Sequence, residues 1–90
     1  MRQVNVYPNP FYSKISIELS SEGYENAIVS LTNDGNQIIK MFSWPLKPGT
    51  NKTALETLDA LSEGTYTIAI KEETGKIISS VLIDKQPKKT

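Results

Sequence analysis

The chain has 90 residues with no cysteine and no histidine, and its ten Lys and Arg residues balance ten Asp and Glu residues. This length favours one domain with a thin hydrophobic core. Without cysteine there is no disulfide or thiol nucleophile, and without histidine the commonest general base and metal ligand are missing. The zero net charge provides no general attraction for nucleic acid or an anionic membrane. Composition therefore favours a small, non-catalytic domain that holds no metal and no cofactor.

The residue types favour strands over helices. Four Val, ten Ile and eight Thr stand against only four Ala, a bias that suits a pleated sheet. Apolar and polar residues alternate with period 2 along most of the chain. The pattern predicts strands near residues 4–7, 15–20, 27–31, 37–43, 51–55, 65–70 and 76–84. Seven short strands at this spacing indicate an all-β, immunoglobulin-like antiparallel β-sandwich spanning residues 1–85, with a flexible polar tail at 86–90.

The alternation also predicts which side chains form the core. The positions expected to be buried are Ile15, Ile17, Val29, Leu31, Tyr66, Ile68 and Ile70. The longest apolar runs are far shorter than the roughly 18 residues of a membrane-spanning helix, and the first residues lack the apolar run of a signal peptide. We therefore expect a domain with no membrane span.

Several segments interrupt the strands. Asn33-Asp34-Gly35-Asn36 predicts a hairpin with a type I′ turn, in which Asp-Gly accepts positive φ. A calcium loop is the weaker alternative, because further oxygen ligands do not follow at alternate positions. Two prolines within 44–49 should end the fourth strand, with a type II turn at Pro48-Gly49. Residues 55–61 are the only segment suited to a short helical turn.

Pro8-Asn9-Pro10 is the most distinctive string in the sequence. Each proline restricts its own φ and disfavours the α region for the residue before it. We therefore expect an extended connector that does not pair with a strand, with Asn9 in a local Asx turn. The alternative is that these residues form a recognition epitope.

Gly64-Thr65-Tyr66 resembles the tyrosine corner of immunoglobulin-like sandwiches. There, a tyrosine near the start of a late strand bonds to backbone a few residues upstream, which here is the segment 58–63. Gly64 would let the chain bend beneath the ring. Glu73-Thr74-Gly75 should turn the chain into the last strand, which begins at Lys76. The lysines at 85, 88 and 89 are too few, and lack the interleaved aromatics, for a nucleic-acid surface.

In this order and spacing, the motifs resemble the type A C-terminal sorting domain of the type IX secretion system of Bacteroidetes. The resemblance covers nearly the whole chain and rests on six segments. These are 6–10 with Pro8-Asn9-Pro10, 14–17, 29–35, 58–66 with Gly64 and Tyr66, 75–78 with Gly75 and Lys76, and 81–85 with Lys85.

The resemblance implies a secretion signal at the carboxyl end of a larger protein. Such a domain would be fused to an N-terminal cargo, cross the periplasm, and be recognised by the outer-membrane translocon, shuttle and sortase components. The cargo would then be anchored at the cell surface or released. We expect the last strand and its basic end, residues 76–89, to carry the export information, and the proline connector mainly to secure the fold.

Two alternatives remain open at this stage. One is a carbohydrate-binding or adhesive β-sandwich module, which would need a planar aromatic platform. The available aromatics, Tyr12, Tyr24, Phe42 and Trp44, are scattered in the sequence. The other is a purely structural immunoglobulin-like spacer.

Overall fold

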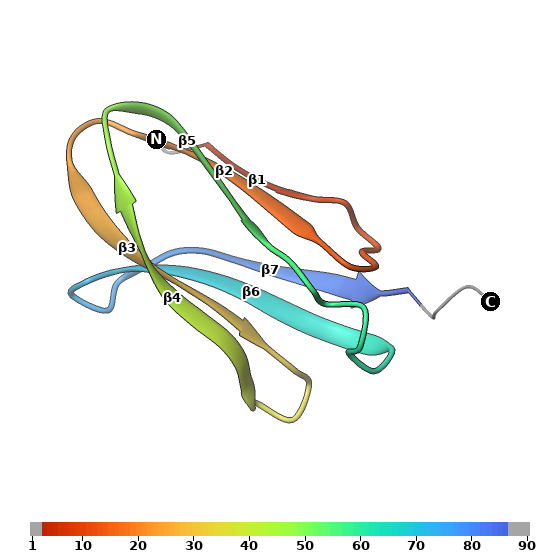
Figure 1. Ribbon diagram of the computed structural model, residues 1–90. Helices are drawn as coiled ribbons and strands as arrows, with labels where there is room; N and C mark the ends of the chain where they lie inside the picture. The colour runs from red at the N-terminus through yellow and green to blue at the C-terminus, as the bar shows by residue number, and fades with distance from the viewer. Residues whose placement is uncertain (1–2, 87–90) are drawn as a thin grey trace.

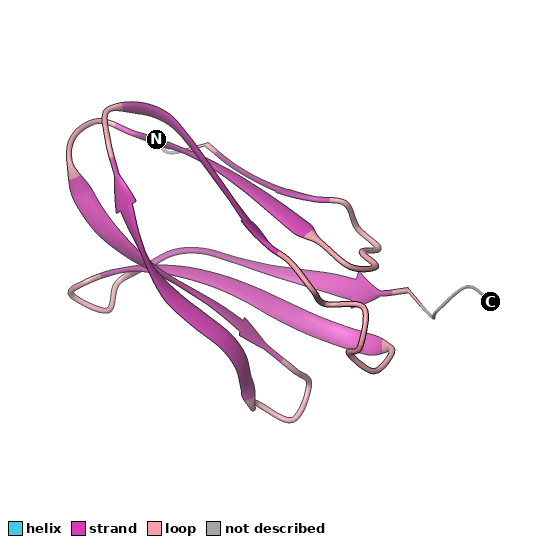
Figure 2. Cartoon of the chain, viewed as in Figure 1, coloured by secondary structure: helices cyan, strands magenta, loops and turns pink. Residues whose placement is uncertain are grey.

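The computed structural model describes residues 3–86, and these contain strands, turns and loops but no helix (Figures 1 and 2). No helix among the described residues is therefore long and apolar enough to cross a membrane. The strands are β1 (Val4–Tyr7), β2 (Ile15–Ser21), β3 (Glu25–Thr32), β4 (Ile38–Leu46), β5 (Gly49–Leu55), β6 (Gly64–Glu72) and β7 (Ile77–Lys85).

The strands form two antiparallel sheets. One sheet has three strands in the order β1-β2-β5, and the other has four in the order β4-β3-β6-β7. Figure 1 shows the two sheets as facing layers, with the chain crossing between them after β2, β4 and β5. This arrangement confirms the predicted all-β sandwich of seven strands. The edge strands are β1 and β5 in the first sheet and β4 and β7 in the second.

The core lies between the two sheets and is lined by alternate residues of each strand. All seven side chains predicted to be buried are buried. Ten core residues have no exposed surface: Phe11, Ile15, Ile17, Leu19, Ala27, Val29, Leu31, Leu58, Ile68 and Ile70. Alternation succeeds here because each sheet covers one face of the other and leaves the opposite face in solvent.

The fourth strand is longer than predicted. β4 continues through Trp44 and Pro45 to Leu46, so the expectation that proline ends this strand is wrong. β4 is an edge strand, where a residue without an N–H can be accommodated. Trp44 and Leu46 flank the proline and are both buried, which holds this part of the strand against the core.

The hairpin between β3 and β4 also differs from the prediction. The residue with positive φ is Asn36, at 64°, and not Gly35. The Asn36 amide donates to the Asn33 carbonyl (3.1 Å), while the Asn33 side-chain oxygen accepts from the amides of Gly35 (3.0 Å) and Gln37 (2.9 Å). These bonds favour a turn followed by one left-handed residue over a two-residue type I′ turn.

The loop between β5 and β6 contains no helical turn, contrary to the prediction for residues 55–61. Leu55 ends β5, and one backbone bond from Leu61 to the Leu58 carbonyl (3.0 Å) closes a single turn. The Leu58 amide instead donates to the Ser13 carbonyl (2.9 Å), and the Leu58 side chain is fully buried. Such a short segment gains more from this anchorage than from helix nucleation.

Candidate functional site

The proline connector, residues 8–14, links β1 to β2 within the three-stranded sheet and contacts the edge of the four-stranded sheet between them. β1 ends at Tyr7, and the chain then bends at Asn9 and Pro10 instead of staying extended. Both the Tyr7–Pro8 and the Asn9–Pro10 peptide bonds are cis. Beyond them, Phe11 forms a parallel bridge with Lys85 at the end of β7. The connector thus pairs at Phe11 with the edge of the four-stranded sheet before the chain returns to the three-stranded sheet at β2.

Three hydrogen bonds join the connector to the end of β7. The Phe11 amide donates to the Asp84 carbonyl (2.8 Å), and the Gln86 amide donates to the Phe11 carbonyl (2.7 Å). The Asp84 amide donates to the Asn9 side-chain oxygen (3.0 Å). The prediction of a connector that does not pair is therefore wrong, as is the local Asx turn at Asn9. The backbone of β7 supplies the hydrogen-bond partners of Asn9 and Phe11 that a local turn would otherwise supply.

Aromatic packing joins the connector to the predicted tyrosine corner. The Phe11 ring has no exposed surface and meets the Tyr66 ring edge-on, with centroids 5.8 Å apart and planes at 74°. The Tyr66 hydroxyl donates to the Ser62 carbonyl at 2.7 Å, within the upstream segment expected for it. Gly64 has φ of 148°, a backbone conformation that L side chains rarely adopt. The tyrosine corner is confirmed.

The basic end of β7 is less accessible than its sequence suggests. Lys85 is only 4% exposed, and its Nζ lies 4.8 Å from the centroid of the Tyr12 ring. The same ammonium donates to the Gln86 carbonyl (2.8 Å). A lysine stem can pack along apolar surface while its charge meets a ring face and a carbonyl. Lysines 88 and 89 and most of the predicted tail lie outside the described residues.

Asp84 is the exposed charged group at this end. Its carboxylate accepts a hydrogen bond from the Thr65 hydroxyl (3.0 Å), while its backbone is held by the connector. Sequence reasoning missed Phe11, Tyr12 and Asp84 as members of this site. Their only signal was position, since Phe11 and Tyr12 follow the second proline and Asp84 precedes the last strand's lysine.

Gly75 and Lys76 do not belong to this cluster. They lie in the hairpin between β6 and β7, where Gly75 has φ of 94° and its amide donates to the Glu72 carbonyl (2.9 Å). The Glu72 amide in turn donates to the Lys76 carbonyl (2.8 Å). The strand register puts this hairpin at the end of β6 opposite Gly64. Gly75 therefore lies in the predicted turn, and Lys76, expected to begin the last strand, immediately precedes β7 instead. Both residues lie away from the other motif residues.

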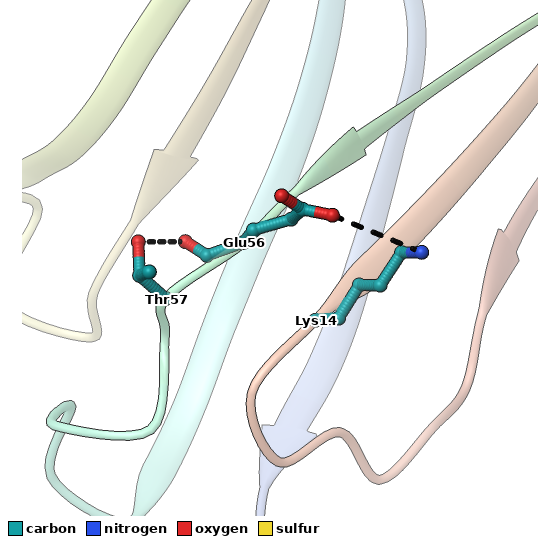
Figure 3. A network of polar contacts seen from close by, with 3 residues as sticks. All are labelled: Lys14, Glu56 and Thr57. Atoms are coloured by element: carbon teal, nitrogen blue, oxygen red, sulfur yellow. Dashed lines mark hydrogen bonds and ion pairs between the residues drawn. The ribbon is translucent and has the colours of Figure 1, made fainter.

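A small polar network supports the loops beside the connector (Figure 3). Lys14 and Glu56 form an exposed ion pair at 3.9 Å, and the Thr57 hydroxyl donates to the Glu56 carbonyl at 2.6 Å. The Lys40 ammonium also donates to that carbonyl (3.0 Å). Exposed ion pairs contribute little stability. This network links the loop after β5 to Lys14, before β2, and to Lys40 on β4.

The cluster of connector, tyrosine corner and β7 end presents hydrogen-bonding groups at the surface. No group of three or more His, Cys, Asp or Glu side chains that would suit a metal ion occurs within residues 3–86. The groups available at the surface are backbone edges, a threonine and a carboxylate. Such groups select a partner by hydrogen bonding and shape.

Comparison with known proteins assigns the family. Residues 5–84 match the family model described as the secretion system C-terminal sorting domain. A search for relatives among curated proteins gave no match. Among solved structures, the chain is similar to a selenomethionine-labelled β-glucosidase from Kluyveromyces marxianus, with a TM-score of 0.59 and 16% identity. That similarity covers 96% of this chain but 14% of the β-glucosidase chain, so it concerns the fold alone.

The family model covers nearly the whole chain and agrees with the resemblance carried by the proline connector, the tyrosine corner and the last strand. Its members are non-catalytic secretion signals, fused to a cargo protein that is secreted or carried to the outer surface and recognised by secretion machinery. The chain belongs to this family, the C-terminal sorting domains of the type IX secretion system.

Proposed function

We propose that the connector and the end of β7 are recognised together, as one surface, by the outer-membrane components of the secretion system. The components that read it are the translocon, its shuttle and the surface sortase, after the fused cargo has reached the periplasm. The observation that carries this proposal is the bond between the Asp84 amide and the Asn9 side chain. It joins two motifs that would otherwise be separate signals.

The arrangement of edge groups supports this assignment. On β7, the amide and carbonyl of Asp84 point away from β6, toward the connector. Backbone N–H and C=O groups alternate in direction along a strand, so those of Ser80 and Leu82 also point away from β6. They lie on the part of the β7 edge that the connector does not cover. A partner strand that adds to this edge would meet the connector directly. The Leu82 side chain, 67% exposed, offers an apolar contact beside it.

An export assay with point variants tests the proposal. The domain is fused behind a periplasmic reporter, and the surface-exposed fraction is compared with the folded fraction of each variant. Asp84→Ala and Leu82→Ser alter exposed side chains at the β7 end, whereas Ser43→Ala on β4 and Lys71→Gln on β6 are matched exposed controls. We expect several-fold loss of export for the β7 variants, with folding unchanged. Deleting residues 83–90 is a poorer test because it removes Ile83, which is buried.

Photo-crosslinking identifies which component reads the surface. A photoreactive residue at position 82 should capture translocon, shuttle or sortase proteins during export, and the same probe at position 43 should not. If export of every variant follows its folded fraction, or if both probes capture the same proteins equally, recognition does not occur at this surface.

A further inference from the structure

A second surface feature lies at the opposite end of the sandwich. An open hollow of about 600 Å³ is lined by residues from the β2–β3 loop, the end of β4 and the start of β5, among them Tyr24, Trp44 and Pro45. The lining includes the end of β4, and this end of β4 pairs with the start of β3. The start of β3 pairs with the end of β6, whereas Lys85 pairs with the start of β6. The hollow is therefore remote from the proposed recognition surface.

The hollow brings together two of the aromatic residues that are scattered in the sequence. The Tyr24 side chain is 86% exposed, while Trp44 is 7% exposed and anchored in the core. Pro45, between Trp44 and Leu46, adds an exposed apolar surface to the same lining. A free aromatic ring beside an apolar wall suits the flat, C–H-bearing face of a sugar ring. Tyr12 and Phe42 do not line this hollow.

Hydrogen bonds hold the floor of the hollow in place. Asn51 is 6% exposed, and its side-chain oxygen accepts a bond from the Lys47 amide (3.0 Å). Its side-chain nitrogen donates to the carbonyls of Lys47 (2.9 Å), Gly49 (3.2 Å) and Leu19 (3.4 Å). One buried amide thus organises the whole β4–β5 turn. The backbone beneath the hollow is therefore held in place before a ligand binds, which lowers the entropic cost of binding.

All charged residues that line the hollow are positive. Its charged residues are Lys47 and Lys52, with no Asp or Glu among them. Lys52 forms an exposed ion pair with Glu18 at 3.7 Å. Because such a pair contributes little free energy, another anion can replace Glu18 at the Lys52 ammonium. Among residues 3–86, no carboxylate lies within ion-pair distance of the Lys47 ammonium. The lining therefore favours an anionic ligand.

We propose that this hollow binds a short acidic saccharide. The Tyr24 ring stacks on one sugar ring, Pro45 contacts its edge, and the ammonium groups of Lys47 and Lys52 bind the carboxylate of a uronic acid. This combination of an apolar wall and a few convergent polar groups is the usual composition of a small-molecule site. The proposal does not depend on the proposed recognition surface, because the two lie at opposite ends of the sandwich.

An NMR titration of the full chain tests the site. The probes are trigalacturonic acid, the neutral trisaccharide maltotriose, and citrate as an anion without a sugar ring. We expect trigalacturonic acid to shift the amide signals of Tyr24, Lys47 and Thr50, and to bind more tightly than either control. Tyr24→Ala and Lys47→Gln should each raise the Kd about tenfold, the loss expected for one stacking or charge contact.

Two further variants serve as controls. Tyr24→Phe keeps the ring and should retain binding, and Lys71→Gln removes a lysine of β6 that does not line the hollow. The folded state of each variant is checked from its unperturbed signals. The proposal is overturned if trigalacturonic acid causes no shifts at millimolar concentration, if citrate or maltotriose binds equally well, or if Lys71→Gln weakens binding as much as Lys47→Gln.

Discussion

The Asn9 side-chain oxygen accepts a hydrogen bond from the Asp84 amide at 3.0 Å, across 75 residues of sequence. An edge strand presents unpaired amides, and this one is capped by an amide side chain between two prolines. Pro10 has no N–H, so the backbone donor to the Asp84 carbonyl is the amide of the next residue, Phe11. The connector therefore completes the last strand as much as it ends the first.

Asn9→Ala should expose the Asp84 amide. The lost hydrogen bond is expected to lower the free energy of unfolding by about 0.5–1.5 kcal/mol. Hydrogen exchange at the Asp84 amide should also become faster, whereas exchange in the centre of β3 changes only with global stability. Asn5→Ala on β1 is the matched control and should leave Asp84 exchange unaltered. Unchanged protection of Asp84 in Asn9→Ala would contradict the capping role.

Tyr66→Phe removes the hydroxyl that donates to Ser62 and keeps the ring against Phe11. We expect a loss of about 0.5–1.5 kcal/mol in the free energy of unfolding, measured by denaturant titration. Tyr24→Phe removes a hydroxyl from an exposed ring and should have no measurable effect. Equal midpoints for Tyr66→Phe and wild type would show that solvent replaces the Ser62 bond.

Ile68→Ala creates a cavity in the centre of β6. Ile68 has no exposed surface, so the substitution should cost about 2–5 kcal/mol of stability. Ile77 is 58% exposed on β7, and Ile77→Ala should change stability by less than about 0.5 kcal/mol. Thermal or denaturant unfolding of both variants provides the measurement. Similar losses for the two variants would be incompatible with this core.

Tyr7 should titrate above its usual range. Its hydroxyl donates to Glu18 at 2.7 Å, and this bond, with desolvation and the Glu18 charge, raises the pKa of Tyr7 above 10.0. A raised folded-state pKa means that the stabilisation is present below the unfolded pKa and is lost as pH rises through the folded value. An NMR titration should show a lower Tyr7 pKa in Glu18→Ala. Glu63→Ala, in the loop before β6, should leave that pKa unchanged.

Local patterns predicted the parts of the structure that depend on neighbours in sequence. Ile15 and Ile17 are buried because alternation alone assigns them to one face of a strand. The bond between Tyr66 and Ser62 spans four residues, and a glycine and a tyrosine at fixed spacing indicate it.

The rest depended on how distant strands lie together. Lys85 lies over the Tyr12 ring, and the two meet only because the connector pairs with the end of β7. Likewise, Pro45 remains within a strand because β4 is at an edge, and edge position is set by the order of all four strands. Alternation within one segment contains no information on either relationship.

The parallel bridge between Phe11 and Lys85 has a mechanical consequence. Tension that pulls β1 and the end of β7 toward opposite ends of the sandwich acts along both paired segments (Figure 1). The bonds from Phe11 to Asp84 and from Gln86 to Phe11 are then loaded in shear, and they must break together instead of opening one after another. Resistance to force depends on the unfolding rate under load. Pulling by a translocating machine would thus be resisted at the proline connector.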